Sequence, residues 1–181
     1  MKKQTFNIQH LCLISLFSAL IVIMAQISIP MPIGVPITMQ TFAVTIAGII
    51  LGSKKGFTAT LIYILLGAIG LPVYANFTGG WQSITGPTSG FILSFPLMAY
   101  IIGLGTEHRS KFRFCFSLGV ALGTLLNMVC GVLMYCLITQ SPLSVGIATC
   151  ALPFVPVTAI KAVIAAISGI NIRKRCYQFL Q

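Results

Sequence analysis

The sequence has very little charge and almost no acid. Only 7% of its 181 residues are charged, and Glu107 is the single acidic residue. Soluble domains carry about 25% charged residues, so this chain lacks the side chains needed to cover a water-facing surface. The composition therefore excludes an ordinary soluble globular protein and indicates an integral membrane protein.

The groups that usually perform catalysis or hold metals are also scarce. General acid–base catalysis needs a histidine or a carboxylate close to the substrate, and besides Glu107 the chain has only His10 and His108. The run GIILGSKKG lacks the spacing of a phosphate-binding loop, and the sequence has no group of carboxylates to bind a metal. We therefore expect no enzyme activity, no cofactor and no metal. The six cysteines form no CxxC pair, so we expect them to pack as small apolar side chains.

What the sequence does contain is a series of long apolar runs, with 57% hydrophobic residues overall. These runs do not alternate between apolar and polar residues, so they predict membrane helices and not a β-barrel. The first run is too long for a signal-peptide core, and we interpret it as the first helix. We predict an all-α integral membrane protein with a single membrane domain over residues 1–181 and six transmembrane helices. They cover roughly 9–29, 38–52, 56–72, 89–105, 113–139 and 156–172.

The basic residues lie between the apolar runs and not on one soluble face, so the net charge of +10 does not indicate nucleic-acid binding. Lysine and arginine mark the cytoplasmic loops of membrane proteins. All but one of the basic residues fall at the two termini, between the second and third helices or between the fourth and fifth. Six spans with both termini in the cytoplasm agree with this pattern. The residues are Lys2, Lys3, Lys54, Lys55, Arg109, Lys111, Arg113, Arg173, Lys174 and Arg175.

Lys161 is the exception, because it lies inside the last apolar run with no acid near it in the sequence. We expect it in the second turn of the last helix, roughly 7 Å below the helix entry. A charge at this depth is costly and commonly marks a functional site. Its ammonium can extend outward to lipid phosphates, donate to backbone carbonyls, or meet a bound ligand with a carbonyl or anionic oxygen. Other polar residues on the same predicted side include Gln40 and Thr158, which supports the ligand hypothesis.

Glycine and small residues recur at spacings that let helices approach closely. Gly48 and Gly52 form one such step, and Gly119 and Gly123 form another. We expect packing within the bundle, and the alternative is a face that docks a partner membrane protein.

Four segments resemble successive parts of the BioY family, the biotin-binding S-components of energy-coupling-factor (ECF) transporters. The resemblance extends over nearly the whole chain, with the same order and spacing. The segments are PITMQTFAVTIAGIILGSKKG, LLGAIGLPVYANFTGG, GPTSGF and LPFVPVTAIKA.

The resemblance implies an S-component fold of six helices that binds biotin beneath the outer loops. It maps an asparagine of the family's site onto Asn76 and a lysine onto Lys161. The family's last motif has an aspartate three residues before the lysine, where this chain has Thr158. Threonine brings no charge, so we expect either that Lys161 depends more on the ligand or that the affinity is lower. We expect Gln40 also to lie at the site, and Tyr74, Phe77 and Trp81 to cover the ligand ring.

The same resemblance implies partners. Family members pair with a transmembrane coupling subunit and two cytoplasmic ATPases, and the docking face on the first helix corresponds here to Ser15, Ala19 and Ile23. The function that we predict is high-affinity biotin binding and uptake across the cytoplasmic membrane. An S-component for another vitamin and a non-transporting membrane scaffold are the alternatives, and the sequence leaves open whether the chain acts alone.

Overall fold

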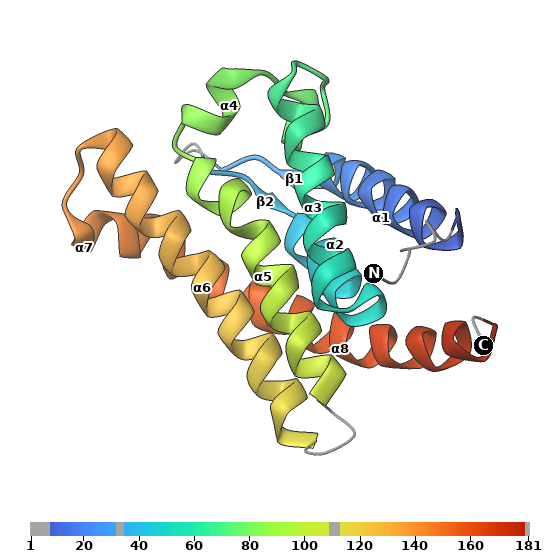
Figure 1. The fold of residues 1–181 in the computed structure, drawn as a ribbon. Coiled ribbons are helices and arrows are strands. Elements are labelled where there is room, and N and C mark those ends of the chain that lie inside the picture. Colours follow the sequence, from blue (N-terminus) through green and yellow to red (C-terminus); the bar gives the residue numbers. More distant parts are fainter. Residues whose placement is uncertain (1–7, 32–34, 109–112, 180–181) are drawn as a thin grey trace, which may run out of the picture.

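The chain folds into a mostly helical bundle, seen in a computed structural model that describes residues 8–31, 35–108 and 113–179 (Figure 1). Lys2, Lys3, Arg109 and Lys111, which the topology prediction used, lie outside these residues. The long helices are α1 (Ile8–Gln26), α2 (Gln40–Leu51), α3 (Ser53–Ala68), α5 (Ser89–Glu107), α6 (Arg113–Thr139) and α8 (Phe154–Phe179). The short elements are β1 (Ser28–Ile29), β2 (Ile37–Thr38), η1 (Ala75–Phe77), α4 (Trp81–Thr85), α7 (Leu143–Gly146) and the π-helical turn η3 (Ile147–Ala151).

Each predicted helix overlaps one of the long helices. The last helix extends to Phe179, beyond the predicted end at residue 172, and two other boundaries differ for local reasons. The prediction extended the first helix to residue 29, whereas Ser28 and Ile29 form a strand that pairs antiparallel with Ile37 and Thr38. Proline disfavours the helical conformation of the residue that precedes it, so the helix ends ahead of Pro30. The third helix ends at Ala68, before Gly70, whose φ of 103° is incompatible with a continuing helix.

Among the described residues, four helices are long and apolar enough to cross a membrane: α1, α5, Phe114–Thr139 of α6 and Phe154–Arg175 of α8. Their outward faces carry large apolar side chains, including Leu16, Leu97, Leu125 and Ile160. Such a surface suits lipid and not water, and it identifies the chain as a membrane protein.

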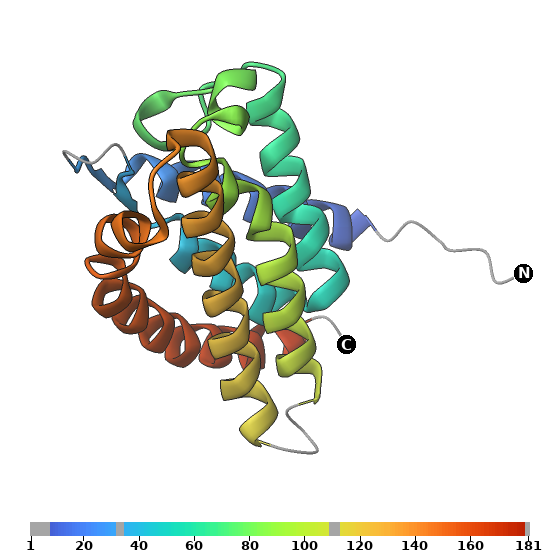
Figure 2. The same cartoon turned by 90° about the vertical axis from the view of Figure 1, so that its left-hand side faces the viewer.

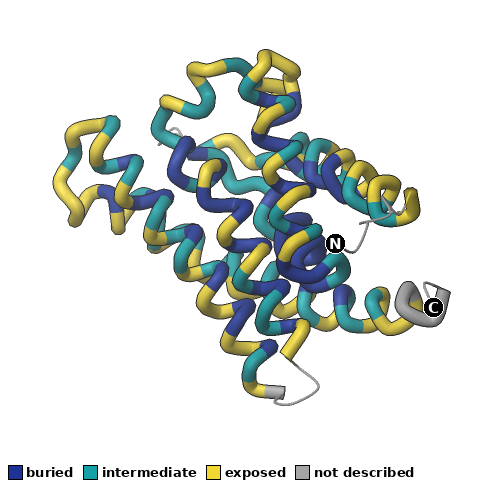
Figure 3. The backbone as a smooth tube through the Cα atoms, in the orientation of Figure 1, coloured by how far each residue is buried: buried dark blue, intermediate teal, exposed yellow. Residues whose placement is uncertain are grey.

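Helix α2 is too short to cross alone, because its 12 residues extend about 18 Å. It lies in the middle of the bundle, where it contacts α1, α3, α5 and α8 (Figure 3). Residues Ala43 to Ile49 are all buried. The shortest of the long helices therefore forms the core around which α1, α3, α5 and α8 pack.

Glycines let the helices approach closely, as expected from their spacing. Gly105 of α5 and Gly119 of α6 face each other so closely that a Cβ on Gly119 would lie 2.9 Å from the Gly105 Cα. A Cβ on Gly56 of α3 would lie 3.1 Å from the Gly48 Cα of α2. The prediction that Gly48 and Gly119 serve packing within the bundle is confirmed.

Two charged side chains stabilise the turn between α2 and α3 through hydrogen bonds. Glu107, at the end of α5, accepts hydrogen bonds from the Ser53 backbone N–H at 2.7 Å and from the Ser53 hydroxyl at 3.0 Å. A carboxylate at the N-terminus of α3 also interacts favourably with the positive end of the helix dipole. Arg173 of α8 donates to the Ile49 carbonyl at 2.6 Å, near the C-terminus of α2. The only acid of the chain is thus engaged at this turn.

The seam between α5 and α6 generates a stability prediction. In Gly105→Ala the new Cβ would lie 2.6 Å from the Cys115 carbonyl oxygen, so the helices must separate. We expect a loss of about 1–3 kcal/mol in unfolding free energy, measured as a lower melting temperature in detergent. Ala121→Leu on the exposed face of α6 is the control. An unchanged melting temperature for Gly105→Ala would contradict the close packing.

Candidate functional site

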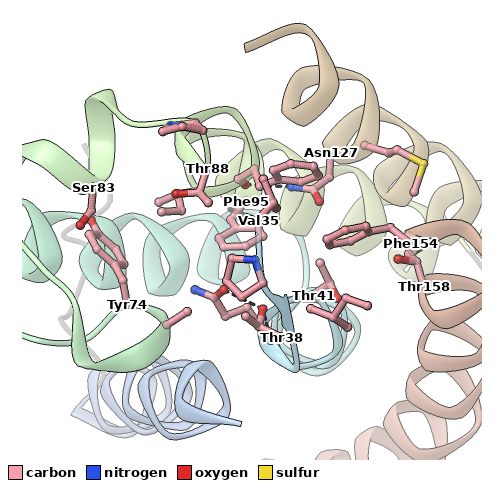
Figure 4. Close-up of a pocket in the computed structure, with 18 of the residues that line it drawn as sticks. Val35, Thr38, Thr41, Tyr74, Ser83, Thr88, Phe95, Asn127, Phe154 and Thr158 are labelled. Carbon is pink, nitrogen blue, oxygen red and sulfur yellow. Dashed lines mark hydrogen bonds between the residues drawn. The ribbon is translucent and has the colours of Figure 1, made fainter. Parts of the chain in front are cut away.

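A cavity of about 280 Å³ opens beside Lys161, where three parts of the chain meet (Figure 4). Its walls come from residues 35–41, from the segment between α3 and α5, and from parts of α5, α6 and α8. Figure 2 shows the backbone of these elements from the side. The polar residues in its lining are Thr38, Gln40, Thr41, Asn76, Thr78, Gln82, Ser83, Thr88, Thr124, Asn127, Thr158 and Lys161.

Lys161 lies in the second turn of α8 and is half-buried. Its Nζ donates to the Thr38 carbonyl oxygen at 2.7 Å, and no carboxylate among the described residues contacts it. An ammonium group has three hydrogens to donate, so two remain for partners in the cavity. Of the environments considered from the sequence, the structure provides a backbone carbonyl and a cavity.

The Thr38 carbonyl is held in place by the strand pairing and by the start of α2. The Met39 N–H donates to the Ile27 carbonyl at 3.0 Å, next to the β1–β2 pair. The Thr38 hydroxyl donates to the Gln40 Oε1 at 2.7 Å, and the Gln40 Nε2 donates to the buried Tyr63 hydroxyl. Gln40 therefore lines the cavity as predicted, but its carboxamide is already engaged on both sides by protein.

Tyr74 forms part of the opposite wall. It is only 1% exposed, its hydroxyl donates to the Ile64 carbonyl at 2.7 Å, and its ring packs edge-on against Tyr63 at 5.5 Å. The ring fills the space above Gly67, where a Cβ would clash with it. Burial raises the pKa of Tyr74 to about 12, so the phenol stays neutral and keeps donating.

Asn76 reaches the cavity from a loop with an unusual backbone. Asn76 and Phe77 have φ angles of 57° and 55°, a conformation that asparagine tolerates and phenylalanine rarely adopts. Gln26 of α1 fixes this loop, because it accepts from the Phe77 N–H at 2.9 Å and donates to the Tyr74 carbonyl at 3.1 Å. The Asn76 Oδ1 accepts from the Ser28 hydroxyl at 2.5 Å, which leaves its amide hydrogens without a described partner.

Two predicted aromatic residues point elsewhere. Phe77 and Trp81 are 71% and 70% exposed and do not line the cavity, so the structure does not bring them to the other predicted site residues. The aromatic lining comes instead from Phe91, Phe95 and Phe154. The rings of Phe91 and Phe154 stack at 6.0 Å, across the gap between α5 and α8.

Thr158 lines the cavity one turn before Lys161 on α8, and its hydroxyl makes no hydrogen bond to a described residue. It remains available to a ligand.

Asn127 is a lining residue that the sequence reasoning missed. It lies in the middle of α6 and is 4% exposed. The available signal was a single carboxamide within a long apolar run, LLNMVC.

The predicted docking residues lie away from the cavity on α1. Ser15, Ala19 and Ile23 are all exposed and share one stripe of the helix, whereas Phe17 and Ile21 are buried against the bundle. The two predicted functions therefore use different surfaces.

Comparison with known proteins finds relatives over nearly the whole chain. The family model described as "BioY family" matches residues 1–178. The biotin transporter BioY of Thermotoga maritima is 42% identical over 88% of this chain and 92% of its own, and biotin transporter BioY2 of Lactococcus lactis is 37% identical over 92% and 91%. A crystal structure of the S-component for biotin from an ECF-type ABC transporter shares the fold, with a TM-score of 0.83 and 24% identity over 96% of this chain and 95% of its own.

The loop contacts of Gln26 lead to a prediction about local stability. In Gln26→Leu the Phe77 N–H loses its acceptor, so we expect amide hydrogen exchange in residues 73–78 to become about fivefold faster or more. Exchange is measured by mass spectrometry on detergent-purified protein. Gln9→Leu, at an exposed position of the same helix, should leave this exchange unchanged. Equal exchange rates in the two variants would show that Gln26 does not hold the loop.

Proposed function

The chain belongs to the BioY family, and from this membership we propose that it binds biotin with high affinity and mediates its uptake across the cytoplasmic membrane. The curated relatives are transporters, so the chain is a transporter component and not an enzyme.

The observation that carries the proposal is an ammonium group beside a cavity, with no carboxylate from the described residues to neutralise it. A ligand with a carboxylate or a polarised carbonyl supplies the missing acceptor, and biotin has both. The volume of about 280 Å³ is near the lower end for small-molecule sites, which suits a compact vitamin.

The remaining lining matches the other parts of biotin. The ring system has an apolar sulfur-containing face, and Phe91, Phe95 and Phe154 offer an apolar wall. The ureido group has two N–H donors and one carbonyl, and polar groups that make no hydrogen bond to a described residue lie around the cavity. Thr158 and the Asn76 amide hydrogens are among them. We propose Lys161, Asn76 and Thr158 as polar contacts and Tyr74 as part of the wall, with Gln40 acting through the position of Thr38.

For the topology, we propose one membrane domain over residues 1–181 with six transmembrane helices and cytoplasmic termini. In this arrangement the short α2 completes its crossing together with the extended strand β2 that precedes it. Two described features support this arrangement. Lys54 and Lys55 open α3, and Arg173 to Arg175 follow Lys161 near the other end of α8. Both groups are at the helix ends away from the cavity. The positive-inside rule assigns these ends to the cytoplasm, so the cavity lies toward the outer side of the membrane.

We also propose that the exposed stripe of α1 formed by Ser15, Ala19 and Ile23 docks an ECF transmembrane coupling subunit, which would act with two ATPase subunits. Small side chains at Ser15 and Ala19 permit close helix approach in lipid. Ile23 is large and 62% exposed, and it supplies apolar contact area at the end of the stripe.

Replacing the lysine tests the proposed function. We expect Lys161→Ala to weaken biotin binding at least about tenfold, a loss of about 1.4 kcal/mol or more, because the ligand oxygen loses its charged donor. Binding is measured by calorimetry on purified protein against a panel of vitamins, and uptake is measured with radiolabelled biotin in cells. Lys174→Ala, exposed on the same helix, is the control. If the wild type bound another vitamin but not biotin, the chain would be an S-component for that vitamin. Unchanged biotin affinity in Lys161→Ala would refute the role of the lysine.

Thr158→Asp tests the departure from the family motif. A carboxylate three residues before Lys161 on a helix can pair with the ammonium and accept a ligand N–H. We expect biotin affinity to be kept or increased. Thr158→Asn, of similar size but neutral, separates the effect of charge from that of shape. A severe loss in the aspartate variant alone would mean that the wild-type cavity depends on an uncompensated cation.

A further inference from the structure

The loop that leads from α3 into α4 leaves four large apolar side chains uncovered. Ile69, Leu71, Phe77 and Trp81 are all exposed, and the sequence has no charged residue from position 56 to position 106. We infer that these four side chains, which we call the loop patch, insert into the membrane–water interface on the side of the membrane where the cavity lies. The inference does not depend on the identity of the ligand.

Backbone contacts bring the members of the loop patch together at the end of α3. The Gly80 N–H donates to the Gly67 carbonyl at 2.7 Å, which places the start of α4 against the last turn of α3. Gly79 packs so tightly that a Cβ on it would clash with the Leu71 carbonyl. Each member of the loop patch lies at, or two residues from, this contact between positions 71 and 79. The end of α3 and the short α4 thus lie together at one end of the bundle (Figure 1).

The loop patch continues an apolar stripe on α3, one of the six helices that we propose to cross the membrane. Leu61 and Leu65 are exposed, and Ile69 follows them at the same spacing of four residues, which puts the three side chains on one face. Ile69 lies only about 6 Å further along the helix axis than Leu65. The exposed apolar surface of α3 therefore extends into the loop without a break, and an apolar surface continuous with a lipid-facing stripe indicates lipid as its occupant.

Phe77 and Trp81 have the chemistry of interfacial anchors. Neither ring packs against another aromatic ring of the described chain, and the Trp81 indole N–H makes no hydrogen bond to a described residue. Tryptophan favours the interface because its ring enters the apolar region while its N–H bonds to headgroups or water. Phe77 has a φ of 55°, which costs energy for phenylalanine. Burial of its ring in lipid would offset this cost, whereas exposure to water would not.

The chain has a single tryptophan, so its fluorescence reports on the loop patch alone. Wild-type protein is reconstituted into phosphatidylcholine vesicles whose acyl chains are brominated either near the headgroup or near the terminal methyl group. We expect the lipid brominated near the headgroup to reduce the emission at least about twofold, and the deeper bromines to quench less. Emission that neither brominated lipid quenches would overturn the inference, because the ring would then face water or a protein partner.

Two variants move the probe while keeping a single tryptophan. In Trp81→Phe combined with Leu125→Trp, the indole lies at an exposed position near the middle of α6, so the deeper bromines should quench it best. In Trp81→Phe combined with Phe77→Trp, another member of the loop patch carries the probe and should repeat the shallow pattern of the wild type. If the two variants gave the same depth profile, the loop would not lie at the interface.

Adding biotin separates an anchor in the membrane from a lid over the cavity. Saturating biotin should leave the lipid quenching of Trp81 unchanged, because this residue does not line the cavity. Loss of lipid quenching on addition of biotin would show that Trp81 leaves the bilayer to cover the ligand, and it would overturn the inference. The quenching measured without biotin decides the inference even for a protein that binds no biotin, so this inference and the proposed function fail separately.

Discussion

The site depends on one hydrogen bond, from the Lys161 ammonium to the Thr38 carbonyl at 2.7 Å. A cation in an apolar helix must be neutralised or solvated, and the chain has a single acid. That acid, Glu107, is engaged with Ser53 at the start of α3. One carbonyl does not replace a counter-ion, so the ammonium, which lines the cavity, is not neutralised by the described protein residues.

The surrounding protein fixes the position of the Lys161 ammonium without neutralising its charge. The hydroxyl of Thr38, the carboxamide of Gln40 and the hydroxyl of Tyr63 form one chain of hydrogen bonds beneath the carbonyl. Such a network is stable because each member has its partner. Its effect is that Lys161 faces the cavity from a rigid support, so a ligand binds a preformed donor and does not have to order it.

The sequence predicted the helices and the position of Lys161 well, and the residues of the aromatic lining poorly, for physical reasons. Apolar runs form helices in lipid, and an isolated charge in such a run stands out, so the position of Lys161 in the second turn of α8 beside a cavity could be predicted. The orientation of Phe77 and Trp81 depends on a loop held by Gln26 from α1, 51 positions away from Phe77, and no local pattern reveals this contact. Asn127, which lines the cavity from α6, was missed because a lone amide in an apolar helix has the same sequence pattern whether it packs against neighbours or faces a cavity.

Helix α1 physically links the two proposed functions. One stripe of it is exposed to lipid and carries Ser15, Ala19 and Ile23. Its end, through Gln26, holds the loop that brings Tyr74 and Asn76 to the cavity. Its middle is fixed to α3 by the bond from the Ser18 hydroxyl to the Ala59 carbonyl at 2.8 Å. A partner that moved α1 relative to α3 would therefore strain the loop over the cavity, and a ligand that held the loop would resist this movement. Because such coupling is reciprocal in free energy, the two proposed functions would be coupled only if docking moved α1 relative to α3 and the loop contacted the ligand.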